Sequence, residues 1–465
     1  MLTRLGEKFT HLFLKFMPDA FVFALVLTII AVLGAFFWLD ATPLKIVESW
    51  YEGFFDLLEF GMQIVLIIIT GFSIALSPVI KKGIDWLTRY INTPGQVYFL
   101  VVMIGMLLCL VSFGWIVITC VLARELAMRV KGVNYPFLVA CVYLSMNSWV
   151  LGLSSSIPLL LNTEKNYLIE AGVLNTMIPT SYTLGSMLNL SMIILLVIGA
   201  PLLMYLLIPK KGDIKEINDL MDNQQFEKSN TIKEEAASLK LPFKSWSDIL
   251  NNSIVLQYII ATMGMAYIIY HFITKGLDLN FNIMIFIFLM IGLFLHKTPM
   301  RYVIAMKRSS SNVSGILFQY PFYAGIMGIM LYTGLGEKLA QILASFATVE
   351  SYPFYAYMAG GFVNFAIPSA GGEFAVIGPS IIEAVKAIGA GLPEAEVESM
   401  IARASLSIAY GESLSNLMQP FYLLLVMPIM ASGIKLQARD VMGYLIIPLV
   451  VFFILQILMV LWIPL

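Results

Sequence analysis

The chain has 465 residues, of which 59% are hydrophobic and only 12% are charged, and its mean hydropathy is +0.87. Soluble domains carry about 25% charged residues, so this composition excludes an ordinary soluble protein and indicates a polytopic membrane protein surrounded by membrane lipids. The net charge of −1 gives no basis for a nucleic-acid partner. Three scattered histidines, and three cysteines without C-x-x-C spacing, suggest no metal site.

Apolar runs predict the membrane spans. The expected spans are 19–39, 57–77, 187–208, 253–273, 281–296, 313–333 and 441–463. No small-residue cleavage site follows the first run, so we take it as a helix and not as a signal peptide. The only substantial polar segment, 209–252, is predicted to be a cytoplasmic linker, and its end is amphipathic, which is typical of a segment at the membrane surface.

Two further regions, at about 96–130 and 353–389, are predicted to be re-entrant hairpins. The first has two apolar arms of roughly 15 residues, which reach about 22 Å and so fall short of the roughly 30 Å of hydrocarbon. The second contains GGFVNFAIPSAGGEFAVIGP (360–379), in which prolines and glycines weaken a helix. Irregular backbone at membrane depth survives only inside protein or beside a wet cavity.

Two membrane helices are predicted to be broken, at about 135–162 and 398–432. The breaks are expected within WVLGLSSSIP (149–158) and AYGESLSNLMQP (409–420). A helix that restarts inside the membrane presents free N–H groups and a positive dipole end, which attract anions. Restarts are expected after Trp115, after Ser154-Ser155-Ser156, at Gly378-Pro379 and after Ser413-Leu414-Ser415-Asn416, and a further interruption at Gln319-Tyr320-Pro321.

The distribution of basic residues sets the expected topology. With a cytoplasmic N-terminus and hairpins that enter from opposite sides, 22 of the 28 lysines and arginines fall on the cytoplasmic side and 6 outside. The order span, hairpin, broken helix, span then recurs with opposite orientation in 1–208 and 253–465. The expected fold class is therefore an all-α polytopic membrane protein, an inverted repeat with two re-entrant hairpins and two broken transmembrane helices that meet near the midplane.

Small polar residues in the interrupted stretches are the candidates for substrate binding, because hydroxyls, amides and glycine N–H groups can hold a carboxylate. They are Ser154, Ser155, Ser156, Ser369, Gly371, Gly372, Ser413, Ser415 and Asn416. Asn147, Gln319 and Thr70 are candidates for lining the path. Each of these residues alone also fits a role in packing or in satisfying a kink.

Two carboxylates, Glu373 and Glu412, stand in these stretches, and an ionisable group at membrane depth is a functional candidate by default. Both are candidates for the coupling ion, with a structural role at helix ends as the alternative. Glu412, expected inside a break, is predicted to carry a proton with the substrate, although oxygen ligands there also fit sodium. Arg403 lies about two turns before Gly411 and either pairs with Glu412 or a bound anion, or reaches the outer interface.

The sequence contains no paired aspartate cluster, no H-E-x-x-H and no Gly-rich phosphate loop. An enzyme and a nucleotide-driven pump are therefore not expected, and no cofactor is expected beyond a coupling ion, H⁺ or Na⁺.

Seven segments together resemble the bacterial short-chain fatty acid transporters, which take up acetoacetate, butyrate and related monocarboxylates and belong to the broad ion-transporter superfamily. The segments are FGMQIVLIIITG (60–71), LARELAMR (122–129), SSSIPLL (154–160), HKTPMRY (296–302), GILFQYPFYAGI (315–326), NFAIPSAGGEFAVIGP (364–379) and AYGESLSNLMQPF (409–421).

The resemblance implies a secondary active transporter of the bacterial inner membrane that moves a small monocarboxylate by alternating access. A carrier for another organic anion such as a dicarboxylate, and an anion channel, remain the alternatives. The sequence leaves the oligomeric state open, a homo-oligomer included.

Overall fold

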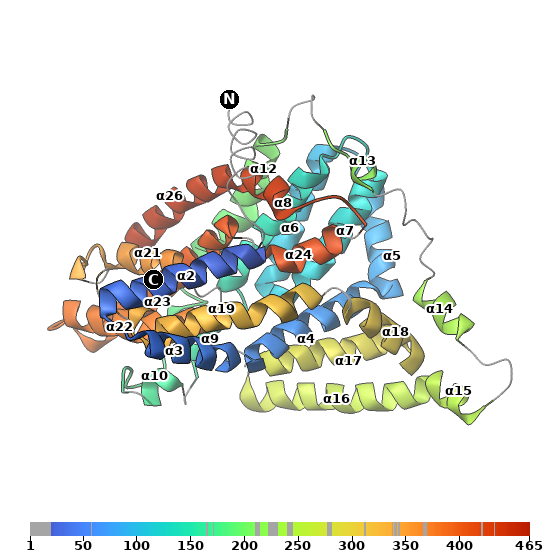
Figure 1. Cartoon of the computed structure of the whole chain (residues 1–465). Helices are drawn as coiled ribbons and strands as arrows, with labels where there is room; N and C mark the ends of the chain where they lie inside the picture. The colour runs from blue at the N-terminus through green and yellow to red at the C-terminus, as the bar shows by residue number, and fades with distance from the viewer. Residues whose placement is uncertain are drawn as a thin grey trace.

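The structure, a computed structural model, is built of helices joined mostly by short connections (Figure 1). It describes residues 20–56, 58–163, 166–170, 172–209, 214–221, 231–239, 245–276, 281–310, 313–336, 338, 342, 345–365, 370–419, 422–431 and 433–465. Among these residues, β-structure is limited to an isolated bridge between Met221 and Ile434. The predicted all-α class is confirmed.

Five helical stretches in the described part of the chain are long and apolar enough to cross a membrane. They are Pro94–Val111, Tyr135–Leu161, Met187–Leu206, Ile254–Lys275 and Ala438–Trp462, and the shorter apolar helices include Ala24–Leu39 and Asn282–His296. Large apolar side chains on the outer helices are exposed, for example Phe37 at 75%, Val255 at 69% and Ile273 at 78%. Such surfaces suit contact with lipid and not with water.

The expected spans of the first half correspond to helices in the structure. The helices before the first interrupted region are α2 (Ala20–Leu39), α3 (Pro43–Asp56), α4 (Leu58–Ala75) and α5 (Pro78–Leu87), and the last span is α11 (Met187–Ile194), the π turn η5 (Leu195–Gly199) and α12 (Ala200–Leu206). The sequence analysis missed α3 and α5. Their sequences mix apolar and charged residues, so they do not stand out as apolar runs.

The first predicted hairpin is present as α6 (Pro94–Val111), the short turn η2 (Phe113–Trp115) and α7 (Ile116–Arg129). The two arms pack on each other, and Arg129 donates to the Thr88 hydroxyl at 2.6 Å and forms an ion pair with Asp85. The hairpin therefore begins and ends at the same end of the molecule. Its first arm, at 18 residues and about 27 Å, is longer than expected.

The first broken helix is also confirmed. It consists of α8 (Tyr135–Ser145), the 3₁₀ segment η3 (Met146–Leu151) and α9 (Ser156–Leu161). The break lies between Gly152 and Ser155, where the Leu153 N–H donates to the carbonyl of Leu110 on the first hairpin at 2.8 Å. A Cβ at Gly152 would lie 2.6 Å from the Leu110 Cα, so glycine permits this close approach.

The linker and the first helices of the second half follow in chain order. They are α13 (Ile217–Leu220), α14 (Ile232–Ser238), α15 (Trp246–Asn251), α16 (Ile254–Lys275), α17 (Phe281–His296), α18 (Pro299–Ser310) and α19 (Ser314–Tyr332). The interruption expected at Gln319-Tyr320-Pro321 is wrong, because α19 is continuous with Pro321 inside it. Packing of α19 against α2 and α3 holds the helix together where proline removes one backbone hydrogen bond.

The second hairpin consists of α21 (Tyr352–Val363) and α22 (Ala370–Ile388), which contact each other, and its turn at 366–369 lies outside the described residues. The restart expected at Gly378-Pro379 is wrong: α22 begins at Ala370 and runs through both residues. Contacts of α22 with α23, α9 and α19 support the helix around Pro379.

The second broken helix consists of α23 (Glu394–Ser415), the 3₁₀ turn η6 (Asn416–Met418) and α24 (Leu423–Met430). The break begins at Asn416 and not at Ala409, and α24 restarts at Leu423, so the expected position inside the break for Glu412 is wrong. Gly411 serves close packing instead, since a Cβ there would lie 2.9 Å from the Tyr357 carbonyl carbon of α21.

The chain ends with α25 (Ala438–Met442), η7 (Gly443–Leu445) and α26 (Ile446–Trp462), which confirm the last expected span. Helices of the second half pack onto those of the first: α9 contacts α22 and α23, and α24 contacts α7 and α8. In Figure 1, α24 lies beside α7, whereas α16 forms one edge of the molecule next to α17. The division into an inverted repeat at 1–208 and 253–465, with a linker at 209–252, stays a prediction.

Candidate functional site

The two broken helices lie against each other and run in opposite directions. The Tyr143 hydroxyl of α8 donates to the carbonyls of Asn416, at 2.6 Å, and Gln419, at 3.0 Å. Farther along the first broken helix, the Asn147 carbonyl accepts a hydrogen bond from the Ser413 hydroxyl at 2.9 Å. The irregular segments η3 and η6 therefore meet inside the protein, as the sequence analysis expected of the two breaks.

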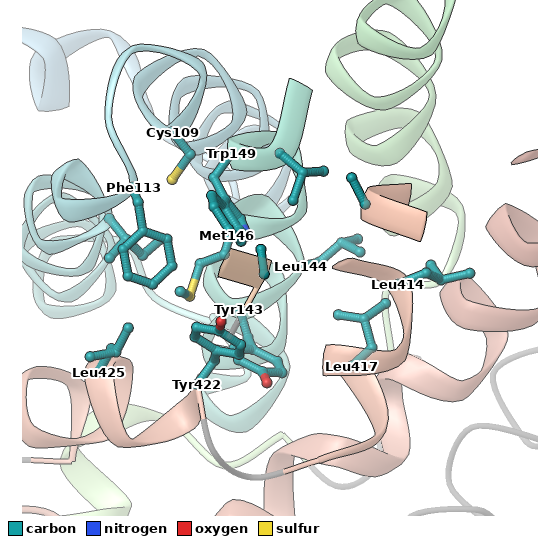
Figure 2. Packing of buried hydrophobic residues seen from close by; sticks show 14 of the residues in the cluster. Cys109, Phe113, Tyr143, Leu144, Met146, Trp149, Leu414, Leu417, Tyr422 and Leu425 are labelled. Carbon is teal, nitrogen blue, oxygen red and sulfur yellow. The ribbon is translucent and has the colours of Figure 1, made fainter. Parts of the chain in front are cut away.

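Aromatic side chains fix this meeting point (Figure 2). Phe113, at the tip of the first hairpin, packs edge-on against Trp149 of η3 and against Tyr422, with ring centroids 5.4 and 5.6 Å apart. Figure 2 shows Met146 between these rings and Tyr143. One hairpin tip thus contacts both broken helices through apolar packing.

Four side chains, which we call the amide cluster, connect the second hairpin to the second broken helix: Asn364, Ser415, Asn416 and Gln419. The amide NH₂ of Asn364 lies 2.7 Å from Ser415 Oγ, 2.7 Å from Asn416 Oδ1 and 3.0 Å from the Glu412 carbonyl oxygen. Gln419 Nε2 donates to the same Asn416 Oδ1 at 2.7 Å. All four residues are buried. Two of these bonds, from Asn364 and Ser415, reach the Glu412 carbonyl in the last turn of α23.

Three amide atoms at this meeting point have no hydrogen-bond partner among the residues that the structure describes. They are the acceptors Asn364 Oδ1 and Gln419 Oε1 and the donor Asn147 Nδ2. A buried polar atom without a partner costs about 1–3 kcal/mol, so native proteins rarely leave several together unless water, an ion or a ligand reaches them. The cluster offers both a free donor and free acceptors.

Glu412 lies in the last turn of α23, one turn before the amide cluster. Its side chain is fully buried, and neither carboxylate oxygen accepts a hydrogen bond from a described residue. Its backbone carbonyl, in contrast, accepts bonds from Asn364 and Ser415. Other side chains thus bond the backbone at this helix end. The Glu412 carboxylate has no such structural role among the described residues.

Glu373 stands in the first turn of α22 and is equally buried, with both carboxylate oxygens lacking a partner in the described part of the chain. Because α22 and α23 are joined by a short connection and pack on each other, the first turn of α22 and the last turn of α23 lie at the same end of this helix pair. The described residues include no group of three or more His, Cys, Asp or Glu side chains arranged to hold a metal ion.

The first serine group lies where α9 meets α22 and α23. Ser154 Oγ accepts the backbone N–H of Phe113 at 3.0 Å, so this hydroxyl ties the break to the first hairpin. Ser155 is buried at the N-terminus of α9 but does not cap it, and Ser156 is half-buried. On α22, a Cβ on Gly371 would meet no described atom within 4 Å.

The remaining candidates are less closely associated with this meeting point. Gly372 is half-buried in the first turn of α22, whereas Ser369 and the side chain of Gln319 lie outside the described residues. Thr70 of α4 is buried and donates to the Leu66 carbonyl of its own helix at 2.6 Å, a bond that many membrane-helix threonines make.

Arg403 does not reach the acidic pair. It lies nine residues before Glu412 on α23, about 13 Å along the axis, and donates to the Val460 carbonyl at 2.9 Å. It also lines a hollow of about 680 Å³ with Ser351, Tyr355 and Trp462 at the end of α26. The interpretation of Arg403 as an interface residue therefore fits better than pairing with Glu412.

Sequence reasoning did not select three residues that organise the site, namely Tyr143, Asn364 and Gln419. Asn364 and Gln419 stand at the edges of the two quoted interrupted stretches. Counting every amide side chain in those stretches, and not only those beside glycine and serine, would have found both. Tyr143 gave no signal, because a tyrosine in an apolar helix is ordinary.

Comparison with known proteins then decides the family. A family model described as short chain fatty acid transporter matches residues 1–463. The chain belongs to the short-chain fatty acid transporter family. Two bacterial proteins that bear this as a provisional name, from Haemophilus influenzae and Escherichia coli, are 33% and 34% identical to it. Each match covers 96% of both chains.

Membership of this family confirms a multi-pass membrane transporter and not an enzyme. The chain is also similar to two solved structures. The Alcanivorax borkumensis YdaH transporter matches with a TM-score of 0.48 and 16% identity over 98% of both chains. Neisseria gonorrhoeae MtrF matches with a TM-score of 0.44 and 15% identity over 97% of this chain and 96% of that one.

Proposed function

We propose that this family member is a secondary active transporter that moves short-chain fatty acids or similar small monocarboxylates across the bacterial inner membrane by alternating access. The observation that carries the proposal is the antiparallel meeting of two broken helices at a buried cluster with unpaired amides. Broken helices that meet in this way form the substrate sites of many secondary transporters. The family description supports the substrate class.

The substrate carboxylate, in this proposal, binds between η3, α9 and the first turn of α22. Asn147 Nδ2 supplies a free donor, and the first turn of α22 supplies the positive end of a 19-residue helix beside Gly371 and Gly372. Ser155, Ser156 and Ser413 stand next to these groups. The described residues of the amide cluster and its neighbours in η3 and α9 include no lysine or arginine, which favours one negative charge on the substrate over two.

Coupling to a proton through Glu412 is the second part of the proposal. A buried carboxylate without a partner is stable mainly as the neutral acid, and a bound anion favours that form further. Proton and substrate would then support each other's binding, which symport requires. Sodium is the second candidate, because Asn364 Oδ1 and Gln419 Oε1 are unused oxygen ligands in the same place.

Transport by the purified chain in liposomes tests this function. We expect labelled butyrate to accumulate when a proton gradient is imposed and Glu412→Gln to abolish accumulation while exchange of butyrate across the membrane continues. Accumulation by Glu412→Gln on a proton gradient alone would exclude Glu412 as the proton carrier. Accumulation that requires a sodium gradient would favour the sodium alternative, and unsaturable flux without counterflow would indicate a channel.

A further inference from the structure

Glu373 and Glu412 come from different elements, and neither has a bond that explains its burial. Glu373 begins α22 of the second hairpin, whereas Glu412 ends α23 of the second broken helix, and these two helices pack on each other. All four carboxylate oxygens are buried and lack a hydrogen-bond partner among the described residues. An isolated buried carboxylate is costly, so each needs a proton, an ion or a ligand.

α22 and α23 are consecutive helices joined by a short connection and they pack on each other, so the first turn of α22, with Glu373, lies beside the last turn of α23, with Glu412. Like charges at short range in a dry site resist joint ionisation, so such a pair holds at least one proton between its members. We propose that Glu373 and Glu412 form one proton-binding unit, which holds a single shared proton in the empty transporter and takes up a second proton from the aqueous phase when a monocarboxylate binds. This inference rests on the proposed function, and it assigns the coupling proton to the pair and not to Glu412 alone.

The charge balance of this step is simple. The empty unit carries one negative charge, and binding of a carboxylate anion together with one proton gives two neutral acids beside one anion. The total charge of the dry region stays at minus one. Because the added anion is offset by the added proton, the substrate enters without a second uncompensated charge.

Other titratable groups of the packed elements do not compensate the pair. The elements are α9, α19, α21, α26, η3, η4 and η6, together with α22 and α23 themselves. Their titratable residues with described side chains are Tyr182, Tyr332, Tyr352, Tyr355, Tyr357, Glu383, Lys386, Glu394, Glu396, Glu398, Arg403 and Tyr410, whereas the side chains of Tyr320 and Tyr323 lie outside the described part.

The two cations and two of the buried tyrosines of this set are engaged elsewhere. Lys386 donates to the Val173 carbonyl and Arg403 to the Val460 carbonyl. Tyr357 donates to Gln456 and Tyr410 to Asn189. The four other acids lie at least ten residues from Glu373 or Glu412 along their helices, which is about 15 Å or more. Among the described side chains of these elements, the pair therefore titrates without a neighbouring cation.

The test is the number of protons that the purified full-length chain takes up when butyrate binds. It is measured by titration calorimetry in buffers of different ionisation enthalpy. We expect uptake of about one proton, and affinity for butyrate that falls roughly tenfold for each rise of one pH unit. Glu373→Gln and Glu412→Gln should each abolish the uptake, because the remaining carboxyl is already neutral. The double variant should behave like either single variant.

Glu383→Gln on the exposed face of α22 is the matched control and should keep the uptake. Glu373→Asp, which keeps a carboxyl, should also keep it, so its loss in that variant would overturn the pair. If Glu373→Gln alone leaves the uptake intact while Glu412→Gln removes it, the shared unit is wrong and the proposed function stands. If the double variant still takes up a proton with butyrate, the proton travels on the substrate, and both the pair and Glu412 as carrier are wrong.

Discussion

The amide side chains around η6 differ in whether their polar atoms form hydrogen bonds with described residues. The NH₂ group of Asn364 has two hydrogens and three acceptors within bonding distance, so it connects the end of α21 to the end of α23. Asn147, by contrast, contributes a carbonyl to Ser413 but leaves its side-chain nitrogen free. At the residue scale, the first amide stabilises the fold and the second is available to a ligand.

Asn364→Ala should lower stability, because Ser415, Asn416 and the Glu412 carbonyl lose a buried donor. The expected loss is about 1–3 kcal/mol, seen as a lower thermal unfolding temperature in detergent. Asn162→Ala, at an exposed amide, is the control and should unfold at the wild-type temperature. Equal unfolding temperatures for all three proteins would contradict the role given to Asn364.

Asn147→Ala should leave stability nearly unchanged, since the side-chain nitrogen has no partner to lose. It should weaken butyrate binding roughly tenfold or more, because a hydrogen bond to a charged group is worth about 1.5–3 kcal/mol. Calorimetric affinity and unfolding temperature together check this expectation. Unchanged affinity would place the substrate carboxylate away from η3.

At the element scale, one helix pair packs closely at a glycine, and the first hairpin is held at its base by ion pairs. α21 and α23 approach so closely that a Cβ on Gly360 would lie 2.8 Å from the Ile408 Cα. At the base of the first hairpin, Arg129 joins Asp85 of α5 and Glu125 of α7. The first contact positions Glu412 next to α22, and the second holds the two hairpin ends together.

Gly411→Ala should separate α21 from α23 and cost about 1–3 kcal/mol, the usual cost of overpacking. The unfolding temperature should fall and transport should fall with it, because Glu412 is the next residue. Gly83→Ala in α5, where a Cβ meets no described atom, is the control and should match or exceed wild-type stability. A Gly411→Ala protein as stable as wild type would show that this helix contact can relax.

The Asp85 carboxyl should make stability depend on pH. Its hydrogen bond with Arg129, aided by the charges of Arg129, Lys81 and Arg89, lowers its pKa below the ordinary value of 3.8. A lowered pKa gives stability that is present above the ordinary value and is lost as the pH falls through the folded-state value.

Thermal unfolding measured between neutral pH and about pH 3 checks this expectation at low salt, since salt screens an exposed pair. Asp85→Asn should remove that part of the acid dependence, whereas Glu48→Gln on α3 should keep it. Identical pH profiles for wild type and Asp85→Asn would mean that the ion pair contributes nothing measurable.

The whole molecule interlocks its two halves. Tyr135 at the start of α8 donates to the Met430 carbonyl at the end of α24, at 2.6 Å, and Arg124 of α7 donates to the neighbouring Ile429 carbonyl at 2.7 Å. The broken helices are therefore held antiparallel at their ends as well as at their breaks. Opposite orientation of the halves in the membrane would place the two hairpins on opposite sides.

Cysteine labelling of intact cells tests that topology at the scale of the molecule. Arg89→Cys and Lys131→Cys flank the first hairpin, and both should react only with a reagent that reaches the cytoplasm. Lys275→Cys, at the last residue of α16, should react from outside. The native Cys109, Cys120 and Cys141 are buried, so they should add little background. Reaction of either position 89 or position 131 from outside would exclude a re-entrant first hairpin.

The sequence by itself determined the elements whose signals are local. The length of the apolar runs predicted the spans. The interruption at Ser112–Trp115 predicted the first hairpin turn, and Gly152 with the three serines that follow predicted the first break. Family membership was also fixed by sequence, because seven segments together are specific. These features depend on the composition of a few helical turns, so tertiary contacts change their position in the sequence very little.

Tertiary structure decided where weak helical sequence remains helical and which side chains meet. Gly378-Pro379, Pro321 and Gly411 all reduce helix propensity, yet α22, α19 and α23 continue through them because neighbouring helices pack on both sides. The meeting of Glu373 with Glu412, and of Asn364 with Asn416, joins elements about 40 to 50 residues apart in the sequence. Such pairs depend on the path of the whole chain, which local propensity and periodicity do not contain.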